Sequence, residues 1–144
     1  MKRLYYIFCI IIPIFASCRY EEPVINFQKP EERLVGYWLL QETQLNGKSV
    51  DTSIYNANIP SMNYYSFYYY GPFSVTSFIN NSIVESKSGS WELVDKDRYL
   101  NIFLILYNKT YNYKAKIIKL SNRELKYRYS DSQGDEWTLH FFKR

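Results

Sequence analysis

The sequence predicts an all-β domain: an antiparallel up-and-down barrel of eight or nine strands with a short N-terminal helical turn. Beyond Gly36 the chain consists of short apolar and aromatic runs separated by turn-forming residues. Apolar and polar side chains alternate within several runs, as half-buried strands require. The connections are all short, so consecutive strands should be neighbours, and closing the sheet into a barrel removes its unpaired edges.

The helical turn is expected over residues 31–35, because Pro30 suits the start of a helix and acidic residues favour its N-terminal end. Gly36 then ends it. Asn46-Gly47 predicts a tight hairpin turn, and Lys87-Ser88-Gly89 is expected to be a turn between two strands. The expected strands, of which Ile83–Ser86 is the shortest, are Tyr37–Leu45, Tyr64–Tyr70, Phe73–Ile79, Ile83–Ser86, Ser90–Val94, Leu100–Tyr107, Tyr111–Leu120, Leu125–Tyr129 and Trp137–Phe142.

Alternation also predicts which side chains face the interior. Tyr127 and Tyr129 lie on one side of their strand, whereas Lys126 and Arg128 lie on the other. The same reasoning applies to the other strands, although a shift of one residue would reverse each assignment. The residues expected to line the interior and contact a ligand there are Trp38, Leu40, Tyr68, Tyr70, Trp91, Tyr113, Tyr127 and Tyr129.

Tyrosine is unusually abundant, with sixteen residues, and aromatic residues make up 19% of the chain. In the run 64–70 both faces of a strand would be aromatic. Tyrosine combines a flat apolar body with a polar tip, which suits aromatic ligands, sugars and protein partners. Two interpretations stay open: one face lines the barrel while residues 51–61 cover the other, or the outer face binds a protein or a glycan.

The N-terminus has the features of an export signal. Lys2 and Arg3 precede an apolar stretch from Leu4 to Phe15, which is shorter than the ~20 residues needed to cross a bilayer. The following residues, Phe15-Ala16-Ser17-Cys18, resemble the lipobox of bacterial lipoproteins. The resemblance implies a signal peptide over residues 1–17, lipidation of Cys18, a tether over residues 18–30 and a barrel domain over residues 31–144.

The lipobox resemblance also implies a location and a partner. The mature chain would be an outer-membrane lipoprotein of a Gram-negative cell, held at the periplasmic or cell-surface face by its lipid. Cys9 would leave with the signal, so no cysteine pair would remain for a disulfide or a thiolate metal site. Loss of Lys2 and Arg3 lowers the formal charge from +4 to +2, which predicts no nucleic-acid partner.

Gly36-Tyr37-Trp38, at the start of the first strand, is similar to the Gly-x-Trp motif that opens lipocalins and lipocalin-like bacterial lipoproteins. A second Gly-x-Trp follows at Gly89-Ser90-Trp91, and paired strands end the chain as they do in that family. The Thr-Asp-Tyr motif of transport lipocalins has no counterpart, so the small lipocalin-like lipoproteins are the better match. The resemblance implies that Trp38 seals one end of the barrel beneath Lys143 or Arg144, and that the interior binds a small hydrophobic or aromatic ligand.

Enzyme chemistry is not predicted. The chain contains no Gly-rich phosphate loop, nucleophile elbow or zinc signature. His140 is the only histidine, and no metal-ligand or triad spacing surrounds it. We therefore expect no catalytic residue, no metal and no cofactor. Because side chains can fill a barrel of this size completely, the alternative function is a surface-exposed protein- or glycan-binding module with no interior ligand.

Overall fold

The computed structural model describes residues 28–51, 62–79, 82–106 and 109–144. The predicted signal segment, Cys18 and most of the predicted tether lie outside these residues, as does segment 52–61. The described part contains the helix α2 (Pro30–Leu34), followed by the strands β1 (Gly36–Leu45), β2 (Lys48–Val50), β3 (Met62–Phe67), β4 (Pro72–Ile79), β5 (Ser82–Val94), β6 (Tyr99–Leu106), β7 (Lys109–Leu120), β8 (Glu124–Ser130) and β9 (Glu136–Lys143).

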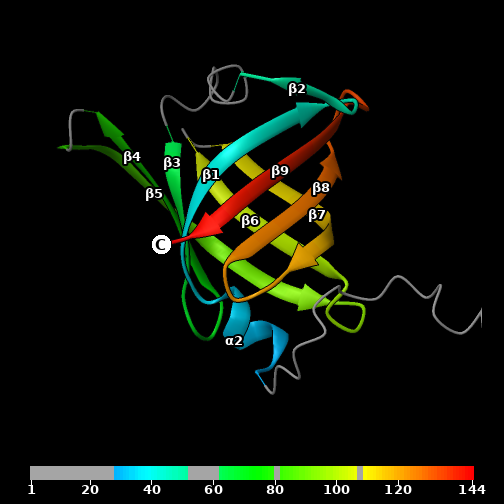
Figure 1. Ribbon diagram of the computed structural model, residues 1–144. Coiled ribbons are helices and arrows are strands. Elements are labelled where there is room, and N and C mark those ends of the chain that lie inside the picture. Colours follow the sequence, from blue (N-terminus) through cyan, green and yellow to red (C-terminus); the bar gives the residue numbers. More distant parts are fainter. Residues whose placement is uncertain (1–27, 52–61, 80–81, 107–108) are drawn as a thin grey trace, which may run out of the picture.

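The strands form one antiparallel sheet that closes on itself, which confirms the predicted up-and-down barrel (Figure 1). Each strand from β3 to β8 pairs with the strand that follows it, and β9 returns to pair with β1. The other edge of β1 is shared, because β3 pairs with residues 36–39 and the extra strand β2 pairs with residues 43–45. Eight strands therefore close the barrel, and β2 is an unpredicted addition at its rim.

The two ends of the barrel differ. Helix α2 lies beneath the end where β1 begins and β9 finishes (Figure 1), and its Leu34 is fully buried against the core. We call this the closed end. At the opposite end, which we call the open end, turn 46–47 joins β1 to β2 and turn 131–135 joins β8 to β9. The sole helix in the described part of the chain is five residues long, too short to span a bilayer.

The two turns at the open end are tied together. Asn46 and Gly47 both have positive φ angles, 49° and 78°, as the predicted tight hairpin turn requires. The Asn46 side chain donates a hydrogen bond to Asp135 Oδ1 at 2.8 Å and accepts one from the Glu136 amide at 2.9 Å. These bonds hold turn 46–47 against turn 131–135.

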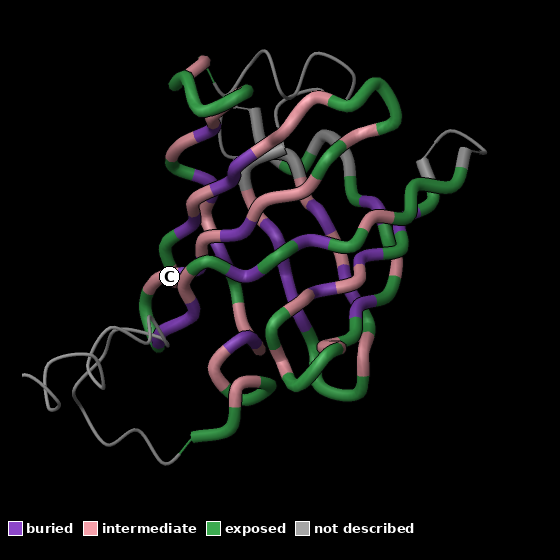
Figure 2. The backbone as a smooth tube through the Cα atoms, turned by 90° about the vertical axis from the view of Figure 1, so that its right-hand side faces the viewer, coloured by how far each residue is buried: buried purple, intermediate pink, exposed green. Residues whose placement is uncertain are grey.

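Buried and exposed residues alternate along the strands (Figure 2), as the sequence pattern predicts. The phase changes once within β1, where the pairing with β9 shifts between Leu40 and Glu42. Trp38 and Leu40 face the interior before this irregularity, and Thr43 does so after it. A β-bulge of this kind moves the following side chains to the other face of the sheet.

One predicted turn is wrong. Residues 87–89 lie within β5, which is a single strand where two strands were expected. Gly89 has a structural role there, because a Cβ atom on it would lie 2.0 Å from the Phe103 carbonyl oxygen of β6. The glycine allows a close approach between β5 and β6, a use of glycine within strands that is distinct from turn formation.

The assignment of faces in the tyrosine run is also wrong. β3 ends at Phe67, and Tyr65 and Phe67 are the buried aromatic residues in it. Tyr68 and Tyr70, which were expected to line the interior, are exposed, with Tyr70 at 96%. The register is set by the pairing of Tyr65 with Trp38, which places both rings inside.

Candidate functional site

The closed end is sealed around Trp38, as the family resemblance implies. Trp38 is fully buried, and its indole Nε1–H donates a hydrogen bond to the Leu34 carbonyl at 2.7 Å. The Lys143 ammonium lies 5.2 Å from the centre of the Trp38 ring and donates a hydrogen bond to the Arg33 carbonyl at 2.9 Å. Arg144, the other candidate for this role, contacts Tyr64 instead.

Gly36 makes room for this arrangement. Its φ angle is +134°, and a Cβ atom at this position would lie 2.5 Å from Lys143 Cε. The glycine of the Gly-x-Trp motif thus satisfies both a backbone conformation and a steric requirement. Burial lowers the pKa of the Lys143 ammonium, which is consistent with an ammonium enclosed between Trp38 and α2.

The interior wall formed by β1, β9 and β8 consists of three rows of paired residues, ordered here from the closed end to the open end. The first row is buried and apolar, and the second is fully buried but includes two hydroxyls, those of its threonine and its tyrosine. The third is only partly buried. The rows, which the strand register defines, are Leu40, Phe141 and Leu125, then Thr43, Leu139 and Tyr127, then Leu45, Trp137 and Tyr129.

The row at the open end continues onto β7. Tyr129 stacks on Tyr113, with ring centres 4.3 Å apart and planes inclined by 24°. Beside them, the Trp137 indole donates a hydrogen bond to Asp131 Oδ2 at 2.9 Å. This bond, with smaller contributions from backbone amides of turn 131–135, holds the pKa of the Asp131 carboxyl below its usual range. The open end therefore presents partly exposed aromatic rings that are fixed in place.

Two polar side chains of the interior were missed by the sequence analysis. Thr43 is fully buried, and its hydroxyl has no hydrogen-bond partner in the described part of the chain. Lys87 pairs with the buried Val75 and is itself only 8% exposed, so it contributes a cation to the interior. Alternation counted back from Trp91 places Lys87 on the inner face, but the neighbouring Ser88-Gly89 suggested a turn.

The predicted lining residues fall into three groups. Trp38 and Trp91 lie at the closed end, where Trp91 Nε1–H donates a hydrogen bond to the Tyr68 carbonyl at 3.0 Å. Both belong to the sealed core. Leu40 and Tyr127 are buried midway along the barrel. Only the stacked pair at the open end, Tyr113 and Tyr129, is both interior and partly exposed, while Tyr68 and Tyr70 lie outside.

His140 lies outside the barrel between two carboxylates. Its Nε2 is 2.6 Å from Glu124 Oε1, and its Nδ1 is 3.8 Å from Glu42 Oε2. The hydrogen bond from Lys119 is the main reason that the pKa of Glu124 is lowered, and the one from Gln44 has the same effect on Glu42. The carboxylates meet opposite nitrogens of the ring, and no metal-binding group of three or more such residues occurs in the ranges described.

Comparison with known proteins identifies the architecture. No model of a known protein family matches the chain, and no curated protein matches it. A lipocalin-like protein from Bacteroides uniformis is similar in structure, with a TM-score of 0.53 and 19% sequence identity over 78% of this chain and 99% of that one. The fold is lipocalin-like. An uncharacterised protein from Bacteroides eggerthii is similarly related, with a TM-score of 0.52 and 19% identity over 77% and 99% of the two chains.

The sealed end is accounted for by this chain's own residues. The Gly-x-Trp motif at residues 36–38, the helix beneath it and Lys143 above Trp38 together close one end of the barrel. At 19% identity the likeness concerns the arrangement of the strands and not a ligand. Any interior site must therefore be argued from this chain's own residues at the open end.

Proposed function

We propose that this chain is a membrane-anchored lipocalin-like lipoprotein that binds a small hydrophobic or aromatic ligand at the open end of its barrel. The observation that carries the proposal is the change in exposure along one interior wall, from fully buried at Thr43 to partly exposed at Trp137 and Tyr129. A ligand that covers these rings gains roughly 25 cal/mol for each Å² of apolar surface removed from water. Rigid aromatic rings with polar tips suit such a role.

The buried Thr43 hydroxyl indicates one further chemical feature of the proposed ligand. A buried polar group without a partner costs about 1–3 kcal/mol, and native proteins rarely leave one unsatisfied. Thr43 lies one row below the exposed rings, within the fully buried part of the wall. Because this hydroxyl is fully buried, a ligand contacts it only when the aromatic row above it shifts on binding, and we propose a ligand with an apolar or aromatic body whose polar group makes that contact.

The proposal of an interior ligand is tested by identifying the compounds that co-purify with the protein. Full-length protein is purified in detergent, extracted with organic solvent, and the extract is analysed by mass spectrometry for compounds in molar proportion to the protein. We expect a bound compound from the wild type and at least tenfold less from Tyr129→Ala. Tyr37→Ala is the matched control, because Tyr37 is 56% exposed on the outer face, and it should retain the compound. Failure to recover any compound, together with no uptake of a fluorescent hydrophobic probe, would overturn the proposal.

Thr43→Val tests the polar contact separately. This substitution keeps the shape of the side chain and removes the hydroxyl, so the empty protein should be no less stable. Affinity for the recovered compound should fall about five- to tenfold, the equivalent of one hydrogen bond. Unchanged affinity would place the polar group of the ligand elsewhere.

Lipid anchoring through Cys18 completes the proposal, because the lipobox-like residues 15–18 directly follow an apolar segment. Cys18→Ala should move the protein from the membrane fraction to the soluble fraction and abolish incorporation of radiolabelled palmitate. The chain supplies its own control, since Cys9→Ala should change neither. Protease treatment of intact cells then distinguishes a cell-surface from a periplasmic position. Continued membrane retention of Cys18→Ala would refute the anchor without affecting the ligand experiments.

A further inference from the structure

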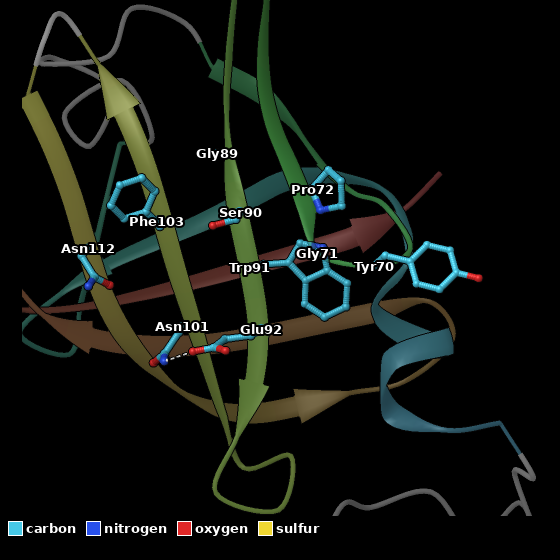
Figure 3. Close-up of a pocket in the computed structure, with 10 residues that line it drawn as sticks. All are labelled: Tyr70, Gly71, Pro72, Gly89, Ser90, Trp91, Glu92, Asn101, Phe103 and Asn112. Carbon is cyan, nitrogen blue, oxygen red and sulfur yellow. Dashed lines mark hydrogen bonds between the residues drawn. The ribbon is translucent and has the colours of Figure 1, made fainter.

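A second concave surface lies outside the barrel and is independent of the proposed interior site. It is an open groove that runs across β4 to β7, from the turn that precedes β4 to the exposed face of β7 (Figure 3), with a volume of about 530 Å³. This volume is within the roughly 300–1,000 Å³ of small-ligand sites. The side chains that carry the argument are Tyr70, Ser90, Glu92, Asn101, Phe103 and Asn112.

The backbone around this groove is held in unusual conformations. The Trp91 amide donates a hydrogen bond to the Gly71 carbonyl at 2.7 Å, which fastens the turn before β4 onto β5. Gly71 has a φ angle of +99°, and Tyr70 before it has one of +67°. A bulky residue with positive φ is a true outlier, and such strain is concentrated at functional sites. Tyr70 marks one end of the groove, and its ring is 96% exposed.

The floor of the groove carries paired polar groups. Asn101 Nδ2 donates a hydrogen bond to Glu92 Oε1 at 2.7 Å, which orients both planar side chains across β5 and β6 (Figure 3). The pair still has a second carboxylate oxygen, an amide oxygen and an amide hydrogen to offer a ligand. The Ser90 hydroxyl and the Asn112 amide also line the groove. Donors and acceptors are therefore present together.

An aromatic ring stands beside these polar groups. Phe103 is 39% exposed, and the strand register places it directly between Ser90 and Asn112 on the outer face. In Figure 3 its ring lies at the end of the groove opposite Tyr70, whose own ring points away from the other lining residues. The groove thus has a flat apolar surface flanked by an amide and a hydroxyl.

This combination selects one class of ligand. Sugar hydroxyls both donate and accept hydrogen bonds, and the C–H face of a sugar ring packs on aromatic carbon, so both features of the groove are matched. None of the ten lining residues is Lys, Arg or His, and Glu92 adds a negative charge, which disfavours phosphate, nucleic acid and acidic glycans. The lining is also too polar for a lipid chain. We propose that this groove binds a neutral oligosaccharide, with Phe103 as the stacking surface and Glu92 and Asn101 as the hydrogen-bonding pair.

The experiment presents full-length protein, purified in detergent, to an array of neutral and acidic glycans, followed by titration calorimetry with the best-bound oligosaccharide. We expect binding to neutral glycans, a loss of affinity of at least tenfold in Phe103→Ala, and a smaller loss in Glu92→Gln. Phe142→Ala is the matched control, because Phe142 is 43% exposed on the outer face of β9, and it should bind as the wild type does. Circular dichroism of each variant checks that the barrel is folded.

Three results would overturn the proposal: no glycan bound, binding confined to acidic glycans, or full affinity retained in Phe103→Ala. An equal loss in Phe142→Ala would likewise place binding elsewhere on the surface. Tyr129→Ala, which removes an interior ring, should leave glycan binding unchanged. These variants therefore distinguish a failure of the glycan-binding proposal from a failure of the interior-ligand proposal.

Discussion

Trp38 and Trp137 occupy opposite ends of the same barrel, and their surroundings differ. Each indole donates one hydrogen bond, Trp38 to the Leu34 carbonyl at 2.7 Å and Trp137 to the Asp131 carboxylate at 2.9 Å. Trp38 is completely buried beneath Lys143, whereas Trp137 remains partly exposed. The closed end is therefore built for stability, while the open end holds aromatic surface in place without covering it.

The groups that accept these two indole hydrogen bonds also differ in their response to pH. A backbone carbonyl does not titrate, so the contact of Trp38 is insensitive to pH. The ionised Asp131 carboxylate is a stronger acceptor than the protonated group, and its lowered pKa reflects mainly the Trp137 hydrogen bond. Protonation of Asp131 in acid is therefore expected to weaken the Trp137 contact at the open end and to leave the hydrogen bond of Trp38 unchanged.

The largest predicted effect is the loss of Trp38. Trp38→Ala should lower the free energy of unfolding by about 3–5 kcal/mol, as truncation of a fully buried aromatic does. Trp137→Ala should cost less, about 1–2 kcal/mol, because part of its surface is already in water. Urea denaturation monitored by circular dichroism measures both. Equal losses of unfolding free energy in the two variants would contradict the proposed difference between the two ends.

A somewhat smaller effect is expected at Gly36. In Gly36→Ala the new Cβ meets Lys143 Cε at a conformation that L residues avoid, so unfolding free energy should fall by roughly 1–3 kcal/mol. Gly134→Ala is the control at the open end, because Gly134 also has a positive φ angle, +89°, but no neighbour within 4 Å of the added atom. Only Gly36→Ala should be partly rescued by Lys143→Ala in a double-mutant cycle. Absence of coupling would show that space for Lys143 is not what Gly36 provides.

Lys143→Met removes the charge while keeping most of the side chain. The variant loses the contact with the Trp38 ring and the hydrogen bond to Arg33, which together contribute about 1–2 kcal/mol. Hydrogen exchange should show faster opening of α2 and the start of β1, with the open end unaffected. Uniform acceleration over the whole barrel would argue against a local role in sealing the closed end.

The fold was predictable because its determinants are local. Alternation within strands such as 125–129, and turn residues such as Asn46-Gly47, specify an antiparallel meander without knowledge of distant contacts. The closed end was predictable for a related reason, since Gly36, Trp38 and the preceding helical turn are contiguous in the chain. Their partner Lys143 is distant in sequence, but the family resemblance supplied it.

The errors arose where distant contacts decide the outcome. The run 64–70 is aromatic on both faces, so alternation alone cannot choose between them, and the pairing of Tyr65 with Trp38 makes the choice. Gly89 lies in a run that resembles a turn, yet its role in the structure is to let the backbone of β5 approach the backbone of β6 closely. Thr43 was missed because the irregularity after Leu40 reverses the pattern that Trp38 begins. A bulge and a close strand approach have no signature in the local sequence.

The smallest predicted effect concerns pH at the open end. Folding lowers the pKa of Asp131, so its contribution to stability is fully present above the unfolded pKa of about 3.9 and is lost as pH falls through the folded value. Asp131→Asn should therefore be less stable than the wild type at neutral pH, by less than about 1 kcal/mol, with the difference vanishing in acid. Thermal unfolding at a series of pH values measures this convergence. Trp137→Phe lacks the indole donor and should show a weaker pH dependence, and an unchanged profile would mean that the backbone amides of turn 131–135 alone lower the pKa.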